Sequence, residues 1–216
     1  FFDYDNDGDL DIFIVNASQG SRTSSSRLYR NDDGVFTDAT EGDLANHNRP
    51  YSGCAAWGDY DNDGHIDLLI ANFDLATNNY LYHNNGDGSF TRVMEGPVVE
   101  DADGTWGAAW ADYDNDGDLD LITIGGWNVF NPLPYEVSPH LYRNEGNGNS
   151  WLNVSLVGMV SNRSGIGAKV RVRANIGGHE VEQLREVSAS AHMHSQSDIR
   201  AHFGLGDATI VDEIEV

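Results

Sequence analysis

Apolar residues in this chain fall into short, strand-sized runs that are separated by polar and glycine-rich segments. The runs at 67–71 (Asp-Leu-Leu-Ile-Ala) and 80–83 (Tyr-Leu-Tyr-His) are representative. They are rich in Val, Ile, Leu, Tyr and Phe and show no helical period, which favours β-strands. The pattern predicts an all-β protein.

The order of these runs repeats along the chain. A nine-residue acidic stretch, D-x-D-x-D-G-x-x-D, begins at Asp3, Asp59 and Asp112, so its spacing is 56 and then 53 residues. A second marker, Leu-Tyr-x-Asn, recurs at 28–31, 81–84 and 141–144. The second unit shows four predicted strands, at 54–57, 67–71, 80–83 and 89–93. Four strands in a repeat of this length are typical of a β-propeller blade.

The spacing places blades at about 1–53, 54–107 and 108–150. The second and third acidic stretches follow a strand of small residues that includes Ala55, Ala56, Ala108 and Ala109, which suits the crowded innermost strand of a blade. The first stretch lacks most of this strand, so the first blade is expected to be truncated. Three blades cannot close a ring, and we expect them to be part of a larger propeller.

The composition changes after residue 150. Half of the 12 basic residues lie between 163 and 200, and the strand-like runs at 169–173 and 181–187 flank a Gly-Gly pair that predicts a hairpin. We therefore predict a small second β-domain over 151–216, truncated at its C-terminal end.

The acidic stretches predict metal sites. Alternating carboxylates in a tight loop can converge on one cation, and the glycine at the sixth position supplies the positive φ of the turn. Ligands made only of oxygen favour Ca²⁺, so the sequence predicts about three calcium sites with a structural role. The seventh position is expected to ligate through its backbone carbonyl, which explains the histidine found there in the second loop. The candidate metal ligands are Asp3, Asp5, Asp7, Asp9, Asp11, Asp59, Asp61, Asp63, His65, Asp67, Asp112, Asp114, Asp116, Asp118 and Asp120.

An EF-hand does not fit these stretches. That motif needs a glutamate at position twelve, and the corresponding residues here are Ile14, Ile70 and Thr123.

The net charge of −23 at pH 7 argues against nucleic acid or an anionic membrane surface as a partner. No apolar run is long enough to span a membrane. Cys54 is the single cysteine, so no disulfide can form within the chain, and a small buried strand residue is expected there.

Several other features carry weaker signals. His192 and His194 could form half of a transition-metal site, but no third ligand is evident. The tryptophans are expected in the blade core, except Trp127, which lies in an inserted loop at 125–139 and is a candidate for ligand binding. No catalytic spacing is present, so no catalytic residue and no enzymatic activity are predicted.

The repeats resemble FG-GAP and VCBS repeats, whose calcium loop is D-x-D-x-D-G-x-x-D, as in integrin-like β-propellers. The segments 161–170, 195–198 and 202–206 (His-Phe-Gly-Leu-Gly) resemble the ASPIC and UnbV domain. The two domains occur together in the cartilage acidic protein family and its bacterial relatives. The resemblance implies a propeller of seven or eight blades that works outside the cell.

We therefore expect a calcium-binding extracellular scaffold, or an adhesion or interaction module, with a protein or glycan ligand and with self-association possible. One alternative is a structural subunit of a surface polymer. The other is a propeller enzyme acting on polysaccharide, which would need converging carboxylates away from the calcium loops.

Overall fold

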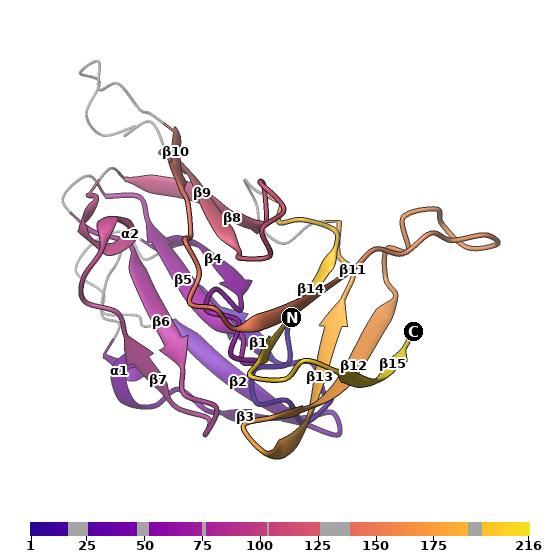
Figure 1. The fold of residues 1–216 in the computed structure, drawn as a ribbon. Coiled ribbons are helices and arrows are strands. Elements are labelled where there is room, and N and C mark those ends of the chain that lie inside the picture. The colour runs from indigo at the N-terminus through magenta and orange to yellow at the C-terminus, as the bar shows by residue number, and fades with distance from the viewer. Residues whose placement is uncertain (17–25, 47–51, 75–76, 103, 126–138, 190–195) are drawn as a thin grey trace.

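The chain is nearly all β (Figure 1). The computed structural model describes residues 1–216 except 17–25, 47–51, 75–76, 103, 126–138 and 190–195. The described residues form 15 strands in five antiparallel sheets, with two helices of four residues each. No helix among them is long and apolar enough to cross a membrane.

The second unit is a complete four-stranded sheet. Its strands are β4 (Ser52–Gly58), β5 (Asp67–Asn72), β6 (Tyr80–Asn84) and β7 (Phe90–Arg92), in the order β4-β5-β6-β7. These strands confirm the four predicted from the sequence, within one to two residues at each end.

The first and third units have three strands each in the described part of the chain. The first contains β1 (Ile12–Ile14), β2 (Arg27–Asp32) and β3 (Val35–Asp38), and an isolated antiparallel bridge joins Phe2 to Asp11. The third contains β8 (Thr105–Ala111), β9 (Asp120–Gly125) and β10 (Pro139–Tyr142).

Strand β11 (Ser150–Val154) lies where the C-terminal domain is predicted to begin. It pairs with β14 (Ala201–Gly206) and not with β10. The sequence of the repeat changes at this point. Phe90 is buried in the second unit, whereas Trp151 stands near that place in the third copy and packs against the third acidic loop.

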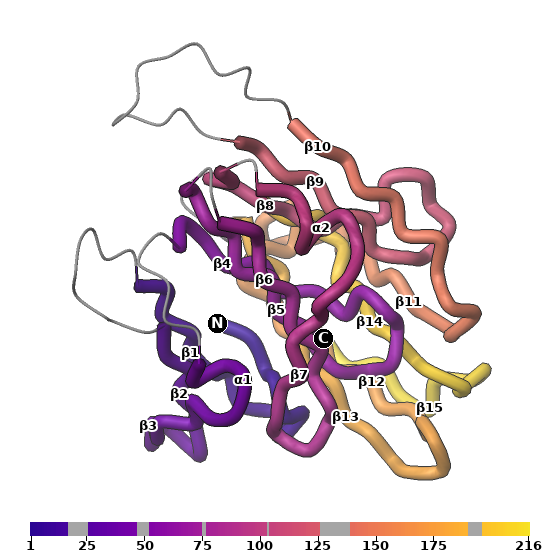
Figure 2. Tube along the Cα trace, turned by 90° about the vertical axis from the view of Figure 1, so that its left-hand side faces the viewer, coloured from indigo at the N-terminus to yellow at the C-terminus, as the bar shows by residue number. Residues whose placement is uncertain are grey.

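The sheets of the three units lie side by side in chain order (Figure 2). Strand β5 is buried on both faces, because it lies between two neighbours. Leu68 and Ile70 join the core shared with the first unit, and Leu69 and Ala71 join the core shared with the third.

Small residues line the place where units crowd together. Ala56 and Ala108 lie in the core between β4 and β8, which contact each other. Cys54 is buried in the same cluster, and burial raises the pKa of its thiol to about 11. The short helices α1 (Gly42–Ala45) and α2 (Pro97–Glu100) each bury one apolar side chain, Leu44 and Val99.

In the described part of the third unit, apolar side chains of β9 and β10 are partly exposed. Ile122, Ile124 and Leu141 are 40%, 47% and 53% exposed. Ile122 and Ile124 follow Asp120 at the spacing at which Leu69 and Ala71 follow Asp67, and those two are buried between units.

The C-terminal domain contains two sheets, β11-β14 and β13-β12-β15. Strands β12 (Lys169–Ile176) and β13 (His179–Glu186) form the predicted hairpin, and β15 (Val211–Glu215) pairs with the other edge of β12. Gly177 and Gly178 both have positive φ, as a two-residue turn between antiparallel strands requires. The sheets share a core that includes Val170, Val172 and Phe203.

A matched pair of substitutions tests this packing. Leu69→Ala removes a fully buried side chain between the second and third units, and we expect it to lower the free energy of unfolding by roughly 2–5 kcal/mol. Ile122→Ala, at the same position of the next unit, is expected to cost much less because that side chain is 40% exposed. Urea unfolding of both variants measures the difference, and equal losses would contradict the proposed stacking.

Candidate metal centre

The three acidic loops share one backbone conformation. The glycine at the sixth position has φ of 91°, 97° and 93° in Gly8, Gly64 and Gly117. The asparagine at the fourth position also has positive φ, close to 60°, which asparagine tolerates better than most residues. The loop turns so sharply because these two positions adopt left-handed conformations.

Backbone amides orient the carboxylates at the two ends of the loop. In the second loop, Asp59 accepts hydrogen bonds from the amides of Asp63 at 3.0 Å and Gly64 at 2.9 Å. Asp67 accepts from the amides of Tyr60 at 3.1 Å and Asn84 at 2.8 Å. The same pairs of donors orient Asp3, Asp11 and Asp120.

The carboxylates gather into compact, partly buried clusters. In each cluster, oxygen or nitrogen atoms able to bind a metal all lie within 4.8 Å of one another. The first and last aspartates of every loop are at most 3% exposed. The clusters are Asp3, Asp5 and Asp11 in the first loop; Asp59, Asp61 and Asp63, and also Asp61, Asp67 and His83, in the second; and Asp112, Asp114 and Asp120 in the third.

Burial makes the negative charge of these clusters costly. It raises the pKa of Asp3, Asp11 and Asp67 to about 7, and neighbouring carboxylates add to the effect. The pKa of Asp59 is raised well above its ordinary value for the same reasons. A bound cation would remove this penalty, because it favours the ionised form.

Each loop also holds a buried carboxylate oxygen without a hydrogen-bond partner. These atoms are Oδ1 of Asp5, Oδ1 of Asp61 and Oδ1 of Asp112. An unpaired buried polar atom is costly, so its presence in all three loops fits a site that binds a cation. The donor set is mainly carboxylate oxygen, which suits a hard divalent ion.

The side chains at the seventh position point to neighbouring groups and lie outside these clusters. Asp118 Oδ1 accepts from the Asn62 amide nitrogen at 2.8 Å, and His65 lies 3.2 Å from that of Asn6. Asp9 accepts from the amide of Asp33 at 2.7 Å.

The fifth-position residues Asp7 and Asp116 accept from the amides of Asp9 and Asp118, respectively. Only the second loop brings its fifth residue, Asp63, into one of the clusters.

Two loops hold a basic side chain that the sequence reasoning missed. His83 Nδ1 lies 3.1 Å from Asp61 Oδ2 and 3.4 Å from Asp67 Oδ1, and the carboxylate of Asp67 raises the pKa of His83 to about 9. Arg143 Nε lies 3.0 Å from Asp114. Both occupy the third position of the Leu-Tyr-x-Asn marker. The recurrence of this marker in every unit was the feature of the sequence that could have pointed to them.

The last residue of that marker joins neighbouring units. The side-chain amide of Asn84 donates to Tyr4 O of the first loop at 2.7 Å and to Ile66 O at 3.1 Å. Asn144 does the same for Tyr60 O and Leu119 O. Each loop also donates to the loop of the following unit: the side-chain amide of Asn6 donates to Gly64 O, and that of Asn62 donates to Gly117 O. The loops therefore form one hydrogen-bonded row.

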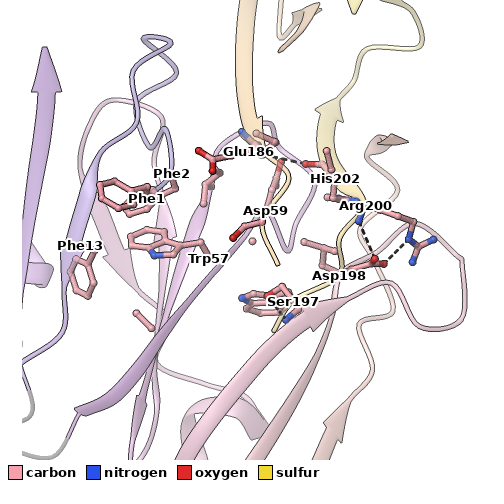
Figure 3. Close-up of a pocket in the computed structure, with 18 of the residues that line it drawn as sticks. Phe1, Phe2, Phe13, Trp57, Asp59, Glu186, Ser197, Asp198, Arg200 and His202 are labelled. Atoms are coloured by element: carbon pink, nitrogen blue, oxygen red, sulfur yellow. Dashed lines mark hydrogen bonds and ion pairs between the residues drawn. The ribbon is translucent and has the colours of Figure 1, made fainter. Parts of the chain in front are cut away.

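A cavity of about 430 Å³ lies between this row and the C-terminal domain (Figure 3). Phe2 and Trp57 lie on one side, and Asp198, Arg200 and His202 on the other. The carboxylates that line the cavity outside the loops are Glu186 and Asp198. Asp198 is paired with Arg200.

Other candidates are resolved only in part. Trp127, His192 and His194 lie outside the described residues, as does most of the 125–139 insertion. Trp110 is buried between units, as expected for a blade tryptophan, whereas Trp151 is 40% exposed.

Replacement of Asn84 tests the row of loops. Asn84→Ala leaves the buried carbonyls of Tyr4 and Ile66 without this donor, and we expect a loss of roughly 1–3 kcal/mol in the free energy of unfolding. The adjacent Asn85→Ala, at an exposed position, serves as control and should change stability by less than about 0.5 kcal/mol. Chemical denaturation compares the two, and the idea fails if Asn84→Ala behaves like its neighbour.

Comparison with protein families agrees with this architecture. The model of the FG-GAP-like repeat matches residues 3–70 and 59–123, and the model named ASPIC and UnbV matches residues 158–216. No curated protein matches the chain. The chain therefore belongs to the family of proteins with FG-GAP-like repeats, and an ASPIC and UnbV domain follows the repeats.

Proposed function

We propose that each acidic loop binds one Ca²⁺ and that the chain is a non-enzymatic interaction module outside the cell. The observation that carries this proposal is the unpaired, buried carboxylate oxygen in each of the three clusters. The first, third, fifth and ninth residues of each loop would hold the ion, with the backbone carbonyl of the seventh.

The role of the ion would be structural. Bound Ca²⁺ would neutralise negative charge on the buried carboxylates. The ninth aspartate already connects the loop to the next marker through Asn31, Asn84 or Asn144. An ion at this point would brace the first, second and third strands of a unit against one another.

The domain combination indicates an extracellular interaction or adhesion-type module. Calcium sites in extracellular modules have dissociation constants of roughly 10⁻⁴–10⁻³ M, so sites of this kind would fill at the millimolar calcium found outside the cell. A net charge of −23 favours a protein or glycan ligand over a polyanion.

Removal of calcium should destabilise the chain. At a tenfold excess of Ca²⁺ over the dissociation constant, each site contributes about 1.4 kcal/mol, or about 4 kcal/mol for three sites. Thermal unfolding with millimolar calcium and with a chelator measures this, and equal concentrations of Mg²⁺ are the control. An unchanged melting temperature, together with no heat in a calcium titration, would show that the loops do not bind calcium.

The metal-free chain should lose stability as the pH rises. An acid whose pKa is higher in the folded than in the unfolded state keeps its proton only when folded, so its contribution falls from about pH 4 to about pH 7. Asp3, Asp11 and Asp67 all behave in this way. His202 opposes them, because burial lowers its pKa to about 3, but His83 acts with them, because Asp67 raises its pKa to about 9.

We therefore expect metal-free protein to be more resistant to urea at pH 5 than at pH 7.5, and calcium to reverse the order. Asp11→Asn mimics the protonated acid and should weaken the pH dependence. Stability that rises with pH in the metal-free protein would contradict the assignment of these carboxyl groups.

A further inference from the structure

Strand β14 of the C-terminal domain lies directly on the second acidic loop. The amide of Gly204 donates to Asp59 Oδ2 at 3.1 Å, and the amide of Gly206 donates to Asn62 O at 2.8 Å. His202 Nε2 lies 2.7 Å from Asn62 Oδ1. The strand thus contacts the first ligand position and the sharpest turn of the loop.

The sequence His-Phe-Gly-Leu-Gly fits this contact. Phe203 and Leu205 point into the core of the C-terminal domain, so the alternate positions 202, 204 and 206 face the loop. A Cβ at Gly204 would lie 2.1 Å from Asp59 Oδ2 and 2.5 Å from Asn62 Cα. Only glycine allows the strand to approach so closely.

The C-terminal domain contacts the third loop as well. The side-chain amide of Asn153 donates to Asp112 Oδ2 at 3.2 Å, and Arg200 donates to Asp112 O at 2.8 Å. Trp151 packs against Gly117. In the first loop, by contrast, the described donors to the Asp3 carboxylate are the amides of Asp7 and Gly8 from its own loop.

We propose that the segment His202–Gly206 is a docking element for the second calcium loop, with Asn153 and Arg200 contacting the third, so that cation binding at these two loops and docking of the C-terminal domain stabilise each other. This inference rests on the proposed calcium binding. The donors from β14 and β11 favour the ionised carboxylate and fix its direction, as the cation requires. By reciprocity, calcium then strengthens docking by the same factor as docking strengthens calcium binding.

Arg185 acts in the opposite sense. Its charge lies near Asp3, Asp59 and Asp67 and would repel a cation. Its hydrogen bonds, however, go to Gln183 Oε1 and to the carbonyls of Leu184 and His202. Its effect on the carboxylates acts through space, whereas Gly204 donates directly to Asp59.

Calcium titration monitored at the backbone amides of Gly8, Gly64 and Gly117 tests this site by site, because these glycines occupy the same position in the three loops. We expect Gly204→Ala and His202→Ala to raise the calcium concentration needed to shift Gly64 roughly tenfold and to leave Gly8 unchanged. His179→Ala, an exposed histidine of the same domain, is the control and should change neither.

Hydrogen exchange provides the reciprocal measurement. In the unsubstituted chain, removing calcium should speed exchange at Gly204 and Gly206 at least tenfold, while Val170 and Leu184 in the C-terminal sheet stay protected. Loss of protection at Val170 in Gly204→Ala would mean that the substitution has unfolded the domain. In that case the calcium response of Gly64 in His202→Ala tests the inference instead.

Two outcomes overturn the inference and differ from each other. If all three glycines respond to calcium but Gly64 shifts at the same concentration in both variants, calcium binding stands and the docking link fails. If none of the glycines responds, the proposed function fails, and the link fails with it.

Discussion

The carboxylate of the ninth loop residue is the interaction on which each unit depends. Asp67 accepts one amide from its own loop, at Tyr60, and one from the end of the third strand, at Asn84. One buried side chain thereby sets the loop, β5 and β6 in register. The cost is a concentrated negative charge beneath the surface, which burial makes harder to keep ionised. The proposed cation would offset this charge.

The loops differ in how the charge is offset in the absence of metal. His83 lies among the carboxylates of the second loop and Arg143 beside those of the third, whereas Arg30 pairs with Asp32 on its own strand. Arg143 is half exposed, so its ion pairs contribute little to stability. Because a cationic side chain competes with a metal for the same oxygens, the three loops are chemically distinct despite their shared backbone.

Features that depend on neighbouring residues could be predicted from the sequence. The all-β fold, the loop glycines, the four strands of the second unit and the hairpin at Gly177 and Gly178 all follow from local turn chemistry and the alternation of apolar residues. Features that depend on packing could not. Asn84 reaches Tyr4 across 80 positions, and Gly204 of β14 donates to Asp59, because these contacts exist only once the units and the C-terminal domain are assembled.

The two unlike faces of each sheet give the array a direction. In the second sheet, Leu68 and Ile70 pack toward the first unit, and Leu69 and Ala71 pack toward the third. Ile122 and Ile124 occupy the positions of Leu69 and Ala71 in the third sheet, so they form the face that points away from the second unit. Such a contact can be repeated between further units with the same chemistry, so the contact itself does not limit their number. The number of units in an array of this kind therefore depends on the angle between neighbouring sheets. The small side chains of Ala56 on β4 and Ala108 on β8 let neighbouring sheets approach closely where these strands meet.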